Sequence, residues 1–374
     1  MNIISGKIKM IVTITFVVYT IFLIAIAFLS GKSMSKISSK NYVDEFFTGG
    51  RKTGVLMLAF ITAAGICSGG TFIGGPGMDN ARGISYSLMN FFSFVFIGVN
   101  TIGTVGKKLG IIARRINADT YMDVFMARYN NNKIILSIGS FAIVIFLLCY
   151  CSSQFIGGAR MLEVITGLDY KVAIILFAVV VIAYSTLGGI RGAGLASILQ
   201  GTVMTIGALA LGIGAVHYAG GMESIFRSLE AFDPTFVNPT TDSMWWMLSL
   251  WVMFGIIYLA MPHGALGCLT YKDTKTLHRA IFVACVCTPI WSISMNFSGL
   301  ASVGIFGALD VADHTTPLMA ATVLHPVLAG LTISGACAAA QSTIAAMLLA
   351  ISVQSSKIFI RNYALLLLRI LKKV

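Results

Sequence analysis

The stretch that decides the fold is Leu56–Gly77, which reads LMLAFITAAGICSGGTFIGGPG and carries no charged residue. It is apolar enough to lie in a bilayer, yet its last thirteen residues include six glycines and a proline. Glycine costs roughly 1 kcal/mol relative to alanine inside a helix, and proline about 3. A small-residue face for close helix packing is the competing interpretation, but the composition favours a helix that breaks within the membrane. Secondary transporters bind ions and substrate at such breaks, where freed carbonyls line a cavity.

Composition places the whole chain among polytopic membrane proteins. Of its 374 residues, 57% are hydrophobic and only 11% are charged, whereas a soluble domain is about 25% charged. The net charge of +12 therefore describes the loops and does not indicate a nucleic-acid partner. The seven cysteines are odd in number and contain no Cys-x-x-Cys pair, so we expect free thiols that pack as small hydrophobes. No cofactor is expected.

Nine apolar runs approach or exceed the ~20 residues that a spanning helix needs. They are predicted at Ile11–Leu29, Leu56–Gly77, Ile84–Gly106, Ile134–Gly157, Val172–Leu187, Leu195–Val216, Ser243–Met261, Ala280–Gly304 and Val327–Val353. The first run follows Lys7 and Lys9 and so resembles a signal peptide. Its 19 residues exceed the ~7–15-residue core of such peptides, which favours a retained helix.

Loop charges orient these spans. The loops after spans one, three, five and seven, together with the C-terminal tail, hold 20 Lys and Arg residues, and the opposite side holds 6. The excess of positive charge marks the cytoplasmic side, so we predict an outside N-terminus and a cytoplasmic C-terminus. The long outside loop 217–242 agrees, because it has four acids and one arginine.

Acidic residues are missing from the nine predicted spans, and all fourteen, Asp79 among them, fall in loops or at span edges. Because buried carboxylates usually mark proton paths, a proton relay is disfavoured, and sodium held by neutral oxygens is the natural coupling ion. Hydroxyls for such a site occur at Ser342 and Thr343 in the ninth span. Hydroxyls in membrane helices more often bond the carbonyl four residues back, so spacing alone leaves ligation open.

The sequence contains no motif that indicates catalysis. There is no His-Glu-x-x-His, Gly-x-Ser-x-Gly or Walker loop. The five histidines are scattered over span edges and loops without the spacing of metal ligands. We therefore predict that the protein is not an enzyme.

Five segments carry a resemblance to a known family. They are FFTGGRKTG (Phe46–Gly54), FIGGPG (Phe72–Gly77), YSTLGGIRGAGLASILQ (Tyr184–Gln200), MPHGALGCLTYKDTKTLHR (Met261–Arg279) and AAAQSTIAAMLL (Ala338–Leu349). Together they resemble the sodium/solute symporters, and within that family most closely the sodium/pantothenate symporters. Each segment alone is a weak signal, but five in the right order over nearly the whole chain are specific.

The resemblance implies an all-α polytopic membrane protein with a LeuT-like fold, in which two inverted five-helix repeats follow one extra N-terminal helix. It implies a single transmembrane transporter domain over 1–374, with the extra helix at 11–29, the first repeat at 55–216, a partial second repeat at 243–355 and a basic cytoplasmic tail at 356–374. The sodium site would use the carbonyls of Ala64, Cys67 and Ala339 and the hydroxyls of Ser342 and Thr343. Substrate contacts are assigned to Ser68, Thr71 and Tyr258.

The chain departs from the family pattern at several places. Ser197 stands where many members carry an acid, Ile66 where some relatives have one, and Gly267 where an arginine is expected. If span two is the first core helix, span nine is the eighth, and the second repeat is incomplete. We therefore expect these 374 residues to insert in the membrane but to need the missing helices, fused or supplied by another polypeptide, to carry substrate.

The leading interpretation is a sodium symporter of the plasma (inner) membrane for a small organic anion, with pantothenate the best single substrate. One alternative is sodium symport of an amino acid or another monocarboxylate. The other is a non-transporting transporter remnant that serves as a membrane scaffold or sensor. The expected partners are the anionic substrate, sodium and the lipid bilayer.

Overall fold

The protein is seen in a computed structural model that describes residues 5–34, 49–92, 102–256 and 261–371. Apart from one isolated β-bridge between Thr53 and Tyr271, the regular structure of these residues is helical. The helices are α1 (Gly6–Met34), η1 (Gly49–Arg51), α3 (Val55–Ile66), η2 (Gly70–Gly74), α4 (Gly75–Arg82), α5 (Ile84–Phe92), η4 (Ile102–Gly106), α7 (Lys107–Arg115), α8 (Tyr121–Arg128), α9 (Lys133–Thr166), α10 (Tyr170–Tyr218), α11 (Met222–Phe232), η5 (Pro234–Val237), α12 (Met244–Trp251), η6 (Val252–Ile256), α13 (Pro262–Thr270), α14 (Thr274–Phe306), η8 (Ala312–His314), α15 (Thr315–Val323) and α16 (Pro326–Leu371).

Most of the predicted spans appear as apolar helices. Among the described residues, five segments are long and apolar enough to cross a membrane, namely Gly6–Lys32, Lys133–Thr166, Gly192–Tyr218, Thr274–Phe306 and Pro326–Ser355. The fifth and seventh predicted spans correspond to shorter apolar helices at Tyr170–Thr186 and Met244–Phe254. The middle of the third span and the end of the seventh lie outside the described residues.

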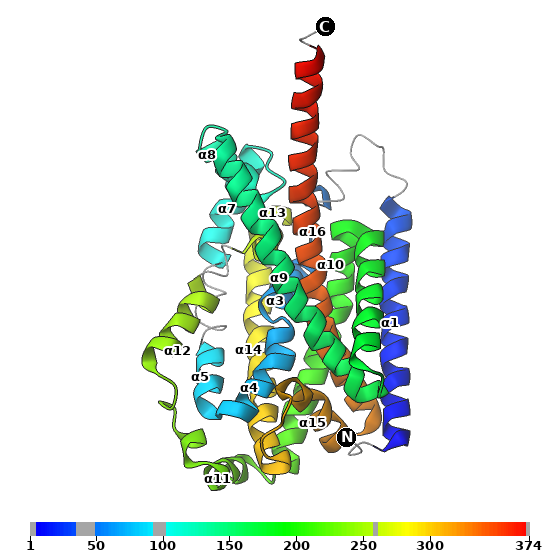
Figure 1. The fold of residues 1–374 in the computed structure, drawn as a ribbon, viewed down its shortest axis with the longest axis vertical. Coiled ribbons are helices and arrows are strands. Elements are labelled where there is room, and N and C mark those ends of the chain that lie inside the picture. The colour runs from blue at the N-terminus through cyan, green and yellow to red at the C-terminus, as the bar shows by residue number, and fades with distance from the viewer. Residues whose placement is uncertain (1–4, 35–48, 93–101, 257–260, 372–374) are drawn as a thin grey trace.

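Small residues let the central helices approach closely. The Cα of Gly207 on α10 faces the backbone of Thr332 on α16, and a Cβ added at Gly207 would lie 2.7 Å from the Thr332 Cα. The Thr332 hydroxyl donates to the Gly207 carbonyl at 3.1 Å. Helix association in membranes rests on such packing and hydrogen bonding. The core of the bundle therefore lies where α10 meets α16, and α1 packs against both of these helices (Figure 1).

α10 contains two predicted spans. Tyr184 and Gln200 are sixteen residues apart in the sequence, which in a straight helix is about 24 Å. Their side chains nevertheless lie next to each other. The chain therefore turns back between the two apolar segments Tyr170–Thr186 and Gly192–Tyr218 of α10.

The two ends of the bundle carry different loops. Helices α7 and α8, which belong to the basic segment 107–133, lie at the same end as the C-terminus, whereas α11 and the N-terminus lie at the other end (Figure 1). This arrangement is the one that the loop charges predict. Which end faces the cytoplasm stays a prediction.

Candidate functional site

The helix that was predicted to break does break. α3 ends at Ile66, and Cys67 leaves helical geometry with φ −91° and ψ 81°. The chain then resumes through the π-helix η2 into α4, and the two halves are bent by 55°. The last carbonyls of a helix have no partner within that helix. The bend therefore leaves carbonyl oxygens of the last α3 turn free to meet other groups.

Side chains of a neighbouring helix form hydrogen bonds with the residues of the break. The backbone N–H of Gly69 donates to Oε1 of Gln154 on α9 at 2.9 Å. The Tyr150 hydroxyl, also on α9, donates to the Ser68 hydroxyl at 3.1 Å. A Cβ at Gly69 would lie 2.7 Å from the Gln154 Oε1 and 3.2 Å from the Ala340 Cβ. Gly69 is therefore needed because α9 and α16 both approach its backbone.

Oxygens from α3 and α16 converge at this point. The Thr343 Oγ1 lies 3.1 Å from the Ala64 carbonyl oxygen and 2.9 Å from the Ala339 carbonyl oxygen. The Ser342 Oγ lies 3.0 Å from the same Ala339 oxygen. A hydroxyl has one proton, so Thr343 can donate to only one of its two carbonyl neighbours. The other pair of oxygens approaches without a proton between them, an arrangement that suits a bound cation.

The surroundings of this oxygen cluster suit a hard monovalent ion. Ala64, Ala339 and Thr343 are fully buried and Ser342 nearly so. Hard cations prefer oxygen ligands such as carbonyls. Within the described part of the chain, no group of three or more His, Cys, Asp or Glu side chains could hold a metal ion. The cluster itself consists of uncharged carbonyl and hydroxyl oxygens, which is the ligand chemistry expected for sodium.

Four of the five residues assigned to sodium thus lie together. Cys67 is fully buried at the end of α3, three residues after Ala64. Of the three residues assigned to substrate, Ser68 and Thr71 are buried at the break. Tyr258 lies outside the described residues.

Gln341 is a site residue that the sequence interpretation missed. It precedes Ser342 on α16, and its side-chain Oε1 accepts from the Tyr19 hydroxyl of α1 at 2.9 Å. Its carbonyl accepts from the Tyr184 hydroxyl of α10. Two helices therefore fix the register of α16 beside the oxygen cluster. The signal was a glutamine within an apolar run, but nothing local to it indicates these partners.

Asp79 corrects one sequence expectation. It was placed at a span edge, yet it is fully buried. The apolar run ends at Gly77, but α4 continues to Arg82 as the second half of the broken span. The helix packs so tightly on α14 that a Cβ at Gly299 would lie 2.7 Å from the Asp79 Cβ. The end of the apolar run is therefore not the end of the buried helix.

The structure shows the surroundings of Ser197 and Gly267, two residues at which the chain departs from the family pattern. The Ser197 hydroxyl donates to the Ala193 carbonyl of its own helix at 2.8 Å, which is the ordinary role of a membrane-helix serine. A Cβ at Gly267 would lie 3.4 Å from the Thr62 hydroxyl of α3. The chain therefore has a compact contact between α13 and α3 at a position where an arginine was expected.

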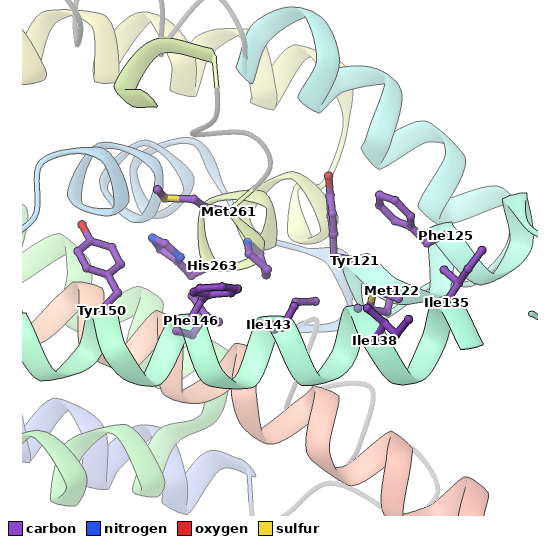
Figure 2. A pocket seen from close by; sticks show the side chains of 14 residues that line it. Tyr121, Met122, Phe125, Ile135, Ile138, Ile143, Phe146, Tyr150, Met261 and His263 are labelled. Carbon is purple, nitrogen blue, oxygen red and sulfur yellow. The ribbon is translucent and has the colours of Figure 1, made fainter. Parts of the chain in front are cut away.

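A cavity of about 640 Å³ reaches the break from the α8 end of α9. Figure 2 shows Tyr121 and Met122 at one end and Tyr150, His263 and Met261 at the other. The wall between them is apolar and comes mainly from α8 and α9. Because the Tyr150 hydroxyl bonds to Ser68, the inner end of the cavity adjoins the broken helix.

A broken first core helix joined by oxygens to a later helix defines a LeuT-like secondary transporter. The chain belongs to the sodium:solute symporter family, whose model matches residues 46–365. A solved structure of a Na+-coupled sialic acid symporter in a substrate-bound outward-open state is similar, with a TM-score of 0.73 over 92% of this chain and 73% of that one, at 18% identity. The all-α, LeuT-like fold and the family resemblance are thereby confirmed.

Curated relatives extend the comparison. The sodium/pantothenate symporter of Escherichia coli is 34% identical over 347 residues, which is 91% of this chain and 70% of the relative. That of Haemophilus influenzae is 33% identical over 333 residues, 87% of this chain and 67% of the relative. The osmoregulated proline transporter OpuE of Bacillus subtilis is 27% identical over 82% of this chain and 63% of its own length.

Proposed function

We propose that this protein takes up a small organic anion together with sodium, and that pantothenate is the substrate that fits best. Two sodium/pantothenate symporters, at 33% and 34% identity, support this choice over the proline transporters, at 27%. The observation that carries the sodium part is the position of the Thr343 hydroxyl between the Ala64 and Ala339 carbonyls.

The proposed sodium ligands are the carbonyls of Ala64, Cys67 and Ala339 and the hydroxyls of Ser342 and Thr343. Sodium at this place would connect α3 with α16, which belong to different repeats in the proposed single domain (first repeat 55–216, second repeat 243–355). A ligand shifts a conformational equilibrium by its difference in affinity for the two states. Sodium therefore favours the conformation in which the two helices are held together.

The proposed substrate position is the break itself, with Ser68, Thr71 and Tyr258 as contacts. The cavity between α8, α9 and α13 is the proposed route from the break toward the end of the bundle that carries the basic loops. Its Tyr150 and His263 side chains lie with ring centroids 5.7 Å apart at the inner end. They would be the first groups that a substrate meets on leaving the site.

Sodium symport of an amino acid is the second candidate, because proline transporters are among the relatives at 27% identity. The chain completed with the missing helices, fused or co-reconstituted in proteoliposomes with an inward sodium gradient and labelled pantothenate, separates the candidates. We expect accumulation that requires sodium and that excess unlabelled pantothenate abolishes while proline does not. Inhibition by proline alone would favour the second candidate.

A binding measurement separates transport from a scaffold role. Because a ligand stabilises the state that binds it, sodium should raise the melting temperature of the purified protein relative to potassium, and Thr343→Ala should reduce that shift. A protein with neither sodium-dependent uptake nor sodium-dependent melting would be a scaffold and would contradict the proposal. The plasma membrane, with the N-terminus outside, is the proposed location.

A further inference from the structure

Asp79 is a fully buried carboxyl group whose chemistry the sodium site does not use. It lies on α4, where the Ser87 hydroxyl donates to its Oδ1 at 2.7 Å. Its second oxygen, Oδ2, has no hydrogen-bond partner among the described residues. A buried charge without a partner is far more costly than a neutral polar group. The surroundings therefore favour a neutral carboxylic acid, with the proton on the oxygen that accepts no hydrogen bond.

Cations that could balance a carboxylate are engaged elsewhere. Arg82, on the same helix, pairs with Asp242 at 2.5 Å. The ionisable groups on the described neighbours of α4 are Tyr86 on α5 and Asp313 and His314 on η8, and His314 contacts Glu163 at 3.4 Å.

The other two neighbours of α4 supply no countercharge either. α15 has no ionisable side chain. On α14, the basic residues end at Arg279, twenty residues before the Gly299 contact, which is about 30 Å along a helix. The described structure therefore places no free cation beside Asp79.

The space at Asp79 suits a proton and not a metal ion. A Cβ at Gly299 would lie 2.7 Å from both the Asp79 Cβ and the Pro76 Cα, so α4 and α14 are in full contact. Hard cations such as Ca²⁺ or Mg²⁺ take about six or more oxygen ligands, whereas the oxygens on this carboxyl and on Ser87 are three. A proton needs no coordination shell.

A polar network links Asp79 to the broken helix. The Asn296 amide on α14 donates to the Ser87 carbonyl at 3.3 Å and accepts from the Asn90 amide at 3.2 Å. A Cβ at Gly75, the first residue of α4, would lie 3.5 Å from the Asn90 Nδ2 and 3.9 Å from the Asn296 Oδ1. A movement of α4 relative to α14 would therefore disturb this network and, at the same time, expose the Asp79 carboxyl group.

We propose that Asp79 is a proton-binding site that is loaded in the conformation seen here and opens to water when α4 separates from α14. This inference rests on the proposed function, since transport supplies that movement. On opening, the O–H bond of the carboxyl breaks, the proton passes to water on the α11 side, and a solvated carboxylate remains. The proton returns from the same side before the helices close again, so it carries no net charge across the membrane.

The test is the pH dependence of sodium-driven uptake in proteoliposomes by the chain completed with the missing helices. Because closure requires a protonated Asp79, we expect uptake to fall as the pH on the α11 side rises, by up to about tenfold per pH unit beyond the midpoint. Asp79→Asn, a neutral isostere, should transport without that fall. Asp313→Asn is the matched control, because burial raises the pKa of this second acid on the same side, and it should keep the wild-type profile.

Two further measurements keep the proposal open to refutation if Asp79→Asn does not fold. Ser87→Ala removes the hydrogen bond that stabilises the carboxylate, so the fall in uptake should move to higher pH. In the purified protein, the infrared carbonyl band of a protonated carboxyl should persist in neutral buffer and shift in Ser87→Ala, because that substitution removes the hydrogen bond to Oδ1. An unmoved pH profile in both variants, or an unchanged band, would overturn the proton site. Absence of sodium-driven uptake in the wild type at every pH would instead overturn the proposed function.

Discussion

The Thr343 hydroxyl on α16 lies 3.1 Å from the Ala64 carbonyl oxygen on α3, although the two residues are 279 positions apart in the chain. This contact joins the last turn before the helix break to the middle of a helix from the other half of the protein. Within the described part of the chain, the neighbouring Ser342 hydroxyl bonds to Ala339 on its own helix. The two hydroxyls therefore differ in what they connect.

The first prediction is that Thr343→Ala weakens sodium dependence more than Ser342→Ala does. Both changes remove one proposed ligand, but only Thr343 spans the two helices. We expect the sodium concentration for half-maximal uptake to rise, with substrate affinity falling in parallel by a coupling of about 1–3 kcal/mol. Thr343→Ser, which keeps the hydroxyl, is the control. Wild-type sodium dependence in both alanine variants would rule out these hydroxyls as ligands.

The second prediction concerns the glycines of the break. Gly69→Ala places a methyl group 2.7 Å from the Gln154 Oε1, whereas a Cβ at Gly74 meets no atom within 4 Å. Overpacking of this kind typically costs about 1–3 kcal/mol. We expect Gly69→Ala to lower uptake and thermal stability and Gly74→Ala to leave both close to wild type. Equal tolerance of the two substitutions would show that α9 and α16 do not clamp the break.

The third prediction is the orientation in the membrane. Asn131 lies between α8 and α9 and Thr276 in the first turn of α14, both in basic segments, whereas Glu230 lies on α11 at the opposite end (Figure 1). By the positive-inside rule, reporters at Asn131 and Thr276 should read cytoplasmic and one at Glu230 external. Reversal at all three positions would invert the orientation, and disagreement among them would contradict the bundle drawn here.

The fourth prediction concerns the driving force. One monovalent anion and one sodium ion together carry no net charge. The family resemblance places Ser197 where many members have an acid that could serve a further cation, so we expect one sodium per anion. The membrane potential is worth about 2.3 kcal/mol per charge per 100 mV. A potassium diffusion potential should therefore leave uptake unchanged. Strong stimulation by an inside-negative potential would indicate a second sodium per cycle.

The helix break was predictable because its cause is local. Glycine and proline destabilise a helix wherever they occur, so Gly65 to Gly77 indicated the bend without knowledge of any partner. The sodium cluster could not be predicted from local sequence alone, because the Ser342 and Thr343 hydroxyls could equally bond to carbonyls of their own helix. The motifs shared with a family supplied the pairing with Ala64, which the structure then placed within hydrogen-bond distance.

Features that depend on packing were not predictable in this way. The burial of Asp79 follows from the close approach of Gly299, which lies 220 residues later in the chain. The hydrogen bond from the Gly69 N–H to the Gln154 side chain likewise joins the break to α9, and the two residues are 85 positions apart in the chain. A single sequence contains no record of such pairings. The expectation of a position at a span edge failed for Asp79 for that reason.

The bond between Tyr19 and Gln341 has a consequence for how the protein is made. The two residues are 322 positions apart, so the tyrosine enters the membrane on one of the first helices and its partner on the last described helix. Until α16 arrives, the Tyr19 hydroxyl must find a lipid headgroup, water or a temporary partner. The proposed ion site is thereby completed only after α16 has entered the membrane. Sodium binding at the proposed site would thus report that α1 and α16 have met, and it would serve as an assay of assembly as well as of transport.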